Sequence, residues 1–155
     1  MALPEKPSER VQAVVERVVE ELGLQGEVSV QEDDEAIRAS VDGDDLALLI
    51  GRHGQTIDAL QLLCFQAAFR GDAERKRVIV DAAGYREKRR EILERRADRA
   101  VDDALRTSQP VELEAMSAQE RRVVHDYLKD RPDLETYSEG DEPNRYLIVS
   151  PVVTD

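Results

Sequence analysis

The chain has 155 residues, of which 41% are hydrophobic, a size that suits one ordinary domain or two very small ones. It contains no Trp, 36% of its residues are charged, and its formal net charge of -12 argues, taken alone, against a polyanionic partner. The single cysteine, Cys64, excludes an internal disulfide and a cysteine metal cage, and no apolar run approaches the ~18 residues that span a bilayer. Because the start, MALPEKPSER, also lacks a signal pattern, we expect a cytoplasmic protein without membrane insertion.

The first half of the chain is predicted to run helix, strand, strand, helix, helix, strand. Ser8 is the expected cap of the first helix, and strands at 27–30 and 36–41 then form a hairpin across an acidic turn. A short helix at 44–50, a longer one at 55–69 and a strand at 77–82 complete this half. The first helix presents one apolar face, made of Val11, Val14, Val15, Val18, Val19 and Leu22.

The helix at 55–69 is apolar nearly all round. We therefore expect both of its faces to be covered, one by the sheet and the other by the second half of the chain or by a partner subunit. The first arc consists of Ile57, Leu60, Leu63, Cys64 and Ala67, and the second of Leu62, Phe65 and Phe69.

The second half is predicted to run helix, strand, helix, strand, strand. A long helix at 85–106 and a strand at 110–114 precede a helix that begins at Ser117, where SAQE has the form of a capping box with Glu120 reaching back. Two strands flank the loop at 140–144. The whole is an α+β protein, with a first domain at 1–83 and a second at 84–155.

Gly51-Arg52-His53-Gly54 interrupts what would otherwise be one apolar helix. Glycine allows a sharp turn and leaves the backbone open to a ligand. The N–H groups that begin the next helix, from Gln55, would then point outward at the positive end of its dipole, where a phosphate can bind. This is the arrangement of the GxxG loop of KH domains, which clamps about four nucleotides of a single strand. A simple turn between two helices is the alternative.

A second candidate site lies on the helix that begins at Ser117. Arg121 and His125 are about 40° apart around its axis, so they are neighbours on one face. We expect this face, with Arg122 beside it, to be exposed to solvent. Two donors of like charge stabilise a helix poorly but form a good fork for a phosphate. The opposite, core-facing arc is expected to hold Val123, Val124, Tyr127 and Leu128.

These features resemble a known family. The order of the first half, with its GxxG loop, resembles a type II KH domain, and the Arg-x-x-x-His helix before a closing hairpin resembles the R-3-H domain. The segments LLIGRHGQTIDALQ, VIVDAAGYREKRRE, LRTSQPVELEAM and ERRVVH are together similar to bacterial Jag proteins, also known as SpoIIIJ-associated or KhpB proteins. The resemblance covers nearly the whole chain and implies a short form, without the N-terminal domain of longer members.

The resemblance implies an RNA-binding post-transcriptional regulator or RNA chaperone, linked to cell envelope growth and cell shape. The implied ligand is single-stranded RNA, with single-stranded DNA as the alternative. The implied protein partner is a small single-KH protein of the KhpA type or a second copy of the chain. The candidate RNA-binding residues are Gly51, Arg52, His53, Gly54, Gln55, Arg121, Arg122, His125 and Arg145.

Two other classes of function remain as alternatives. The KH-like unit could be a degenerate domain that serves as a protein-interaction or dimerisation module. An enzyme is not expected, because the chain has no nucleophile elbow, P-loop or zinc signature, and we predict no catalytic residue, no cofactor and no small-molecule substrate. The acidic runs EDDE and DGDD lack the spacing of a calcium loop, so no metal site is expected either.

Charge is unevenly distributed along the chain. Residues 1–50 hold 4 basic and 13 acidic side chains, whereas residues 70–106 hold 12 basic and 9 acidic ones. On the long helix, Lys88, Arg95, Arg99 and Arg106 line up as a basic ridge. This ridge could track phosphates, or it could be a solvated face with ion pairs from Glu91 to Arg95 and from Asp102 to Arg106; the sequence favours neither.

Overall fold

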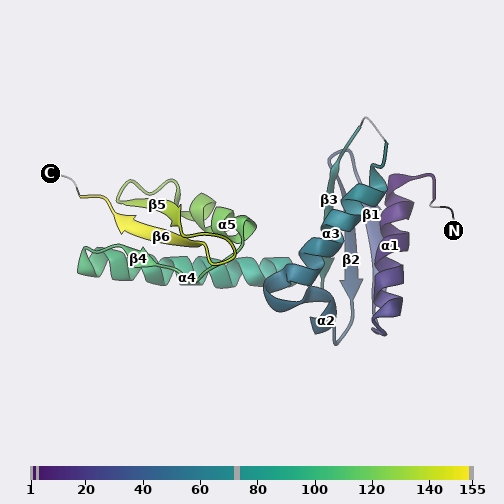
Figure 1. Cartoon of the computed structure of the whole chain (residues 1–155), viewed down its shortest axis with the longest axis horizontal. Helices are drawn as coiled ribbons and strands as arrows, with labels where there is room; N and C mark the ends of the chain where they lie inside the picture. The colour runs from purple at the N-terminus through teal and green to yellow at the C-terminus, as the bar shows by residue number, and fades with distance from the viewer. Residues whose placement is uncertain (1, 3, 72–73, 154–155) are drawn as a thin grey trace. The chain divides into compact units, whose positions relative to one another are not determined.

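The structure is a computed structural model, which describes residues 2, 4–71 and 74–153 (Figure 1). The chain divides into two compact units, Met1–Arg86 and Glu87–Asp155. Each unit combines helices with its own three-stranded sheet and its own apolar core. The predicted α+β class and the order of elements in both halves are confirmed. Across the described part of the chain, no helix combines the length and the apolar character that crossing a membrane requires.

The sheet of the first unit has the strand order β1-β2-β3, in which β2 is antiparallel to β1 and parallel to β3. Helices α1 and α3 lie side by side over one face of this sheet (Figure 1). The elements are α1 (Pro7–Glu21), β1 (Glu27–Glu32), β2 (Ala36–Asp42), α2 (Ala47–Ile50), the 3-10 turn η1 (Arg52–Gly54), α3 (Gln55–Ala68) and β3 (Arg77–Ala82).

The core of the first unit is aliphatic, as the composition predicts. Alternate residues of β2 point into it, so that Ile37, Ala39 and Val41 are buried while Ser40 and Asp42 are exposed. The helices contribute Val11, Val15, Val19, Ile57, Leu60, Cys64 and Ala68. Two helix starts differ from the prediction: α2 begins at Ala47 rather than at residue 44, and α1 begins before Ser8.

The cap of α1 is Lys6, and Ser8 lies inside the helix. Pro7 occupies the first turn, where its missing N–H costs nothing and its fixed φ suits a helix, so the helix begins before Ser8.

The prediction that both faces of α3 are covered is only partly correct. Leu62 and Leu63 are 60% and 59% exposed, and Phe69 is buried in the core.

The second unit continues from α4, whose first two residues belong to the first unit. Its sheet is antiparallel throughout, with the order β4-β6-β5. The core lies between apolar residues of α4, α5 and the sheet, including Leu93, Ala97, Val124, Leu147 and Val149. The elements are α4 (Tyr85–Thr107), β4 (Val111–Glu112), α5 (Ala118–Leu128), β5 (Leu134–Glu139) and β6 (Tyr146–Pro151).

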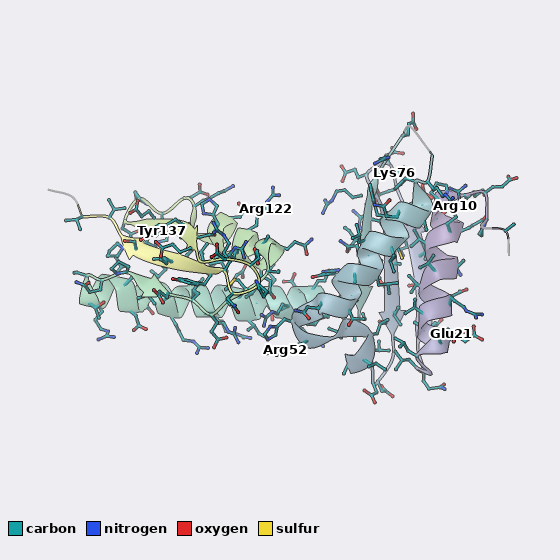
Figure 2. All side chains as sticks on the ribbon, viewed as in Figure 1. Arg10, Glu21, Arg52, Lys76, Arg122 and Tyr137 are labelled. Atoms are coloured by element: carbon teal, nitrogen blue, oxygen red, sulfur yellow. The ribbon has the colours of Figure 1, made fainter. Side chains whose placement is uncertain are left out.

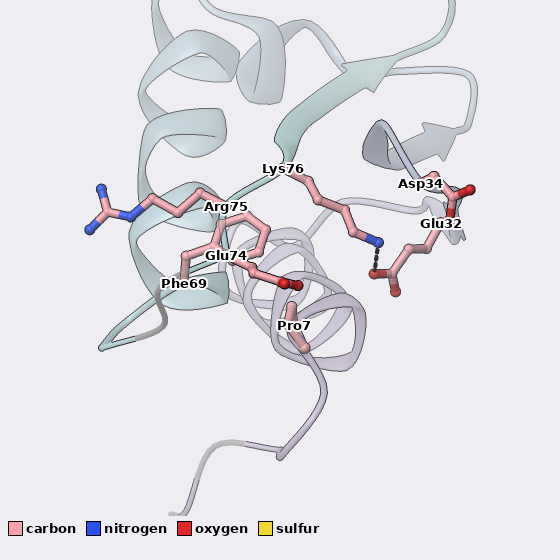
Figure 3. Close-up of a pocket in the computed structure, with 7 residues that line it drawn as sticks. All are labelled: Pro7, Glu32, Asp34, Phe69, Glu74, Arg75 and Lys76. Carbon is pink, nitrogen blue, oxygen red and sulfur yellow. Dashed lines mark hydrogen bonds and ion pairs between the residues drawn. The ribbon is translucent and has the colours of Figure 1, made fainter.

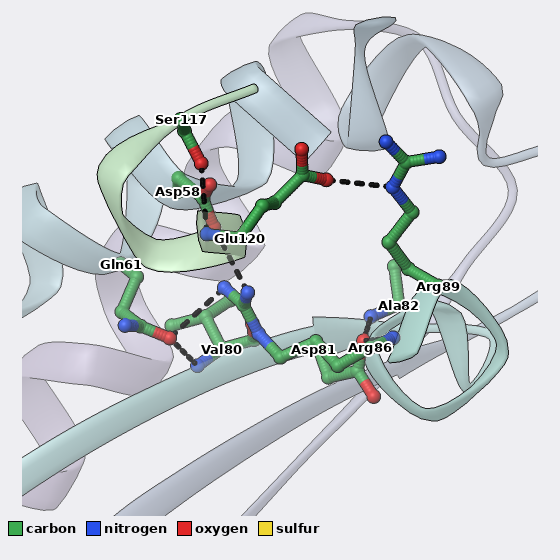
Figure 4. A network of polar contacts seen from close by, with 9 residues as sticks. All are labelled: Asp58, Gln61, Val80, Asp81, Ala82, Arg86, Arg89, Ser117 and Glu120. Atoms are coloured by element: carbon green, nitrogen blue, oxygen red, sulfur yellow. Dashed lines mark hydrogen bonds and ion pairs between the residues drawn. The ribbon is translucent and has the colours of Figure 1, made fainter. Parts of the chain in front are cut away.

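Helix α5 begins at the predicted cap. The side chain of Ser117 accepts a hydrogen bond from Glu120 N at 3.3 Å, which satisfies one free N–H of the first turn. The predicted reach of Glu120 back to the cap is wrong, because its carboxylate accepts from Arg89 Nε at 2.6 Å (Figure 4). Both of these side chains are largely buried. An ion pair to α4 thus replaces half of the capping box.

Candidate nucleic-acid interface

The loop between α2 and α3 has the broken-helix geometry that the sequence predicts. Gly51 and Gly54 both have positive φ, at 73° and 77°, and His53 between them lies in the left-handed region at φ 53°, ψ 29°. Gly54 N donates to Gly51 O at 3.3 Å and closes the turn. Three residues with positive φ within four positions reverse the chain, so that α3 starts afresh in a new direction.

Close packing independently requires glycine at both ends of the loop. A Cβ atom at position 51 would lie 2.8 Å from Thr56 Cβ, and one at position 54 would lie 2.7 Å from Tyr85 Cε1. Such distances are shorter than van der Waals contact allows. Gly51 is half-buried and Gly54 is buried, so both positions need glycine for packing as well as for their positive φ.

The side chains on the rim of the loop are free to meet a ligand. Arg52, His53, Gln55 and Thr56 are all exposed. The side chains of Arg52 and His53 make no hydrogen bond or ion pair with any residue that the structure describes. The N-terminal N–H groups of α3 begin here, at the positive end of a 14-residue helix. The arrangement offers two cationic or polar side chains and a helix N-terminus to one anion.

A polar network fixes the start of α3 (Figure 4). Arg86 donates to Asp58 Oδ1 at 2.9 Å, to Gln61 Oε1 at 3.0 Å and to Val80 O at 2.8 Å. The same Gln61 oxygen accepts from Val80 N at 3.0 Å. Asp58 is the acidic residue in the first turn of α3, where its charge would repel a phosphate. Pairing with Arg86 offsets that charge and ties α3 to β3.

The second candidate site is a pocket of about 410 Å³ in the second unit. The structure brings all four cationic residues predicted for this unit to its lining, and Figure 2 labels Arg122 and Tyr137, which belong to it. Three hydroxyl side chains of β5, which the sequence did not single out, also line it. The lining residues are Ala118, Arg121, Arg122, His125, Thr136, Tyr137, Ser138, Arg145 and Leu147.

Arg121 does not face solvent as predicted. It is 8% exposed, and its guanidinium donates to Met116 O and to Glu142 Oε1, each at 2.7 Å. Helical spacing correctly places it beside His125, but the loop between β5 and β6 supplies Glu142 from outside the helix. No local sequence signal identifies this glutamate as the partner.

The other pocket residues differ in how firmly they are held. His125 is exposed, and its Nδ1 shares a hydrogen bond with Thr136 Oγ1. The Arg122 side chain is 83% exposed and lies 3.8 Å from Asp126, so its charge is available to a ligand. Arg145 donates to Gly140 O at 2.7 Å and so also tethers the loop that precedes it.

One residue of the predicted core-facing arc lies outside the core. Tyr127 is 42% exposed, and its hydroxyl donates to Asp98 Oδ1 at 2.9 Å. This hydrogen bond to a carboxylate raises the pKa of Tyr127. The prediction was wrong because a tyrosine can pack its ring at the edge of a core while its hydroxyl stays wet.

The basic ridge on α4 does not carry the predicted ion pairs. Arg106 pairs with Asp103 at 3.0 Å rather than with Asp102. The side chains of Arg95 and Arg99 are exposed and make no ion pair or hydrogen bond with any residue in the described part of the chain. Two of the four ridge cations are thus unneutralised on the outer face of the helix.

A groove of about 630 Å³ in the first unit was not anticipated (Figure 3). Two of its charged residues pair with each other: Lys76 Nζ donates to Glu32 Oε1, and also to Asp33 O, both at 2.9 Å. The hydrogen bond lowers the pKa of Glu32 and raises that of Lys76. Among the described residues, no three His, Cys, Asp or Glu side chains gather so that they could hold a metal ion.

Comparison with known proteins identifies both units. Residues 8–81 match the family model of the KhpA/KhpB KH domain, and residues 91–151 match that of the R-3-H domain. The chain is 36% identical over 146 residues to RNA-binding protein KhpB of Bacillus subtilis, an alignment that covers 93% of this chain and 70% of that protein.

Two further relatives carry the same name. The KhpB of Clostridium symbiosum is 35% identical over 88% of this chain and 62% of its own length. That of Streptococcus pneumoniae is 28% identical over 94% of this chain but only 44% of its own length, so the chain spans less than half of this longer relative. With both domains matched in this order and the predicted resemblance confirmed, the chain belongs to the KhpB family, in which a KH domain of the KhpA/KhpB type is followed by an R-3-H domain.

Proposed function

We propose that this protein binds single-stranded RNA through two separate surfaces, the loop Gly51–Gly54 and the pocket that Arg121, Arg122, His125 and Arg145 line. The observation that carries the proposal is the loop itself. Two tightly packed glycines shape the turn at the N-terminus of α3, and the exposed side chains of Arg52 and His53 between them have no hydrogen-bond or ion-pair partner among the described residues.

The acidic composition then limits affinity. With ~3 phosphates contacted, the log-log dependence of binding on salt has a slope of about -2 for a single strand. We propose a binding protein rather than an enzyme, acting in the cytoplasm as a post-transcriptional regulator or RNA chaperone linked to cell envelope growth and cell shape. The support for this wider role is kinship with proteins named RNA-binding protein KhpB.

The test is fluorescence-anisotropy titration of a short mixed-sequence single-stranded RNA at two salt concentrations. The test variant is Arg52→Asp, His53→Asp, because substitutions at the glycines would collide with Thr56 or Tyr85 and disturb the fold. Aspartate at position 53 tolerates the left-handed backbone. The control is Gln12→Asp, Arg17→Asp on the exposed face of α1, which makes the same change in formal charge.

The loop variant should lose most of the binding while the control retains it. Equal binding by the two variants would exclude the loop as the clamp, and absence of binding by the natural protein would overturn the proposal. A DNA of the same sequence, titrated in parallel, distinguishes RNA from single-stranded DNA as the ligand.

A second function, association with another KH protein, is favoured by the exposed leucines of α3. We propose that Leu62 and Leu63 contact a small single-KH partner of the KhpA type or a second copy of this chain. Leu62 belongs to the arc predicted to meet a partner, but Phe69 of the same arc is buried and packs edge to face on Phe65, with ring centroids 5.5 Å apart. Light scattering of the natural protein and of Leu62→Glu, Leu63→Glu tests self-association. If both the natural protein and the variant are monomers, self-association is excluded. The KhpA-type partner is then tested by mixing it with each of the two proteins and repeating the light scattering.

A further inference from the structure

The ion pair between Arg121 and Glu142 is asymmetric. The Arg121 side chain is 10% exposed, whereas that of Glu142 is 57% exposed. Arg121 is also held from the other side by Met116 O, at 2.7 Å. The arginine is therefore fixed in the fold, whereas the exposed glutamate side chain can leave the ion pair and be solvated by water.

The base of the loop that carries Glu142 is tethered as well. Arg145 donates to Gly140 O at 2.7 Å and to Ser138 O at 3.4 Å, so both sides of the turn between β5 and β6 are linked. A rotation of the Glu142 side chain alone, without movement of the strands, can release the guanidinium. The Glu142 carboxylate is thus a displaceable partner of a guanidinium that the fold holds in place.

A phosphate and the Glu142 carboxylate can bind the same N–H groups of Arg121. A carboxylate and a phosphate both offer an arginine a pair of anionic oxygens, and a guanidinium binds either one through the same fork of N–H groups. The pocket around Arg121 also contains the exposed cation of Arg122, the ring of His125 and the hydroxyl of Thr136.

We propose that Glu142 is an internal competitor of RNA: its carboxylate occupies the donor of Arg121 that a backbone phosphate needs, and binding at this site requires its displacement. This inference rests on the proposed function and adds a regulatory contact to it. The contact lowers the affinity of the pocket and raises its selectivity, since only an anion that gains further contacts in the pocket can displace a carboxylate that is already in place.

The test is RNA binding by the full chain carrying Glu142→Gln, with Asp141→Asn as the matched control. Both variants remove one negative charge from the same loop, but only Glu142 contacts Arg121. We expect Glu142→Gln to bind up to about fivefold more tightly than the control, the upper end of the range that loss of one competing ion pair produces.

A third variant, Glu142→Asp, preserves the net charge while shortening the side chain by one methylene. It should also bind more tightly than the natural protein. All titrations are repeated with Arg52→Asp, His53→Asp in the same chain, so that the remaining binding reports on the pocket.

Equal affinities for Glu142→Gln and Asp141→Asn would show that only loop charge matters and would overturn the competition. Weaker binding by Glu142→Gln would also overturn it, because Glu142 would then be holding Arg121 in its binding position. If pocket binding falls when His125 is replaced by Ala but does not respond to Glu142→Gln, the proposed function stands and the competition fails. If no protein in the set binds RNA, both fail.

Discussion

The aromatic ring of Tyr85 lies directly against Gly54, so that a Cβ atom built on the glycine would stand 2.7 Å from Tyr85 Cε1 and 3.1 Å from its hydroxyl oxygen. Gly54 ends the loop before α3, and Tyr85 begins α4. The last glycine of the loop is therefore required twice, by its φ of 77° and by the ring beside it. The loop is shaped by its own neighbours before any ligand arrives.

Replacement of Gly54 by alanine should accordingly destabilise the first unit more than the same change at Gly23. Gly23 has a similar φ, 67°, but open space around its Cβ position. Gly23→Ala should cost about 1 kcal/mol from backbone strain alone. Gly54→Ala should cost a further 1–3 kcal/mol or so, because the added methyl group overpacks against Tyr85. Urea unfolding followed by circular dichroism measures both losses of stability. Equal losses would mean that the Tyr85 ring can move aside at no cost, and would contradict the prediction.

Much of this architecture could be predicted because its signals are local. The valines of α1 repeat at helical spacing, β2 alternates buried and exposed residues, and Ser117 stands where a cap is expected. The break at Gly51 and Gly54 is equally legible, since two glycines three positions apart in an apolar segment are typical of a turn between helices. Each of these features depends on residues within a few positions of one another.

The errors at Arg121 and Glu120 share one physical origin, which is contact between residues distant in the chain. Arg121 is covered by Glu142, which lies 21 residues further along the chain. Glu120 does not complete the capping box because it binds Arg89, which is 31 residues away in the sequence. Helical periodicity defines the face on which Arg121 lies, but it carries no information about which loop covers that face.

Burial of Arg121 predicts that its removal damages the fold as well as the site. Arg121→Ala leaves Met116 O without its donor and empties the space of a large side chain, so the second unit should lose about 2 kcal/mol of stability. His125→Ala, at an exposed position, should cost less than about 1 kcal/mol. Thermal unfolding compares the two. A similarly small loss for both would show that Arg121 is not structural. With the expected losses, only His125→Ala is suitable for testing RNA binding.

The turn between β1 and β2 should lose stability in acid. Asp33 Oδ1 accepts from Ala36 N at 2.9 Å and from Glu35 N at 2.8 Å, and these hydrogen bonds, with the neighbouring Arg38, lower the pKa of Asp33 below its ordinary 3.8. A carboxyl whose pKa falls on folding stabilises the protein above its unfolded pKa, and this contribution disappears as pH drops through the folded value.

The stability gap between the natural protein and Asp33→Asn should therefore be widest near neutral pH and close below about pH 4. Asparagine retains the Oδ1 acceptor, so the comparison isolates the charge. Urea midpoints measured from neutral to acidic pH test this expectation, and a gap that stays constant over the whole range would contradict it.

The thiol of Cys64 should be inert while the protein is folded. The side chain is fully buried in α3, and burial raises the pKa of its thiol to about 12. The reactive thiolate is then negligible at mildly alkaline pH, and reagents cannot reach the sulfur. Iodoacetamide should modify Cys64 only after unfolding in urea, as mass spectrometry can follow. Rapid modification of the native protein would indicate that α3 opens readily.

The two unpaired arginines of the α4 ridge should contribute to RNA binding. Arg95→Gln, Arg99→Gln removes two charges that no described residue neutralises, and should weaken binding at low salt and flatten the salt slope by up to ~1.4. The control is Arg90→Gln, Arg106→Gln on the same helix, where each arginine already pairs at 3.0 Å, with Glu94 and Asp103. Identical effects of the two double variants would assign the ridge to general electrostatic attraction. A larger loss for the first pair would place phosphates on it, since both variants lower the net charge equally.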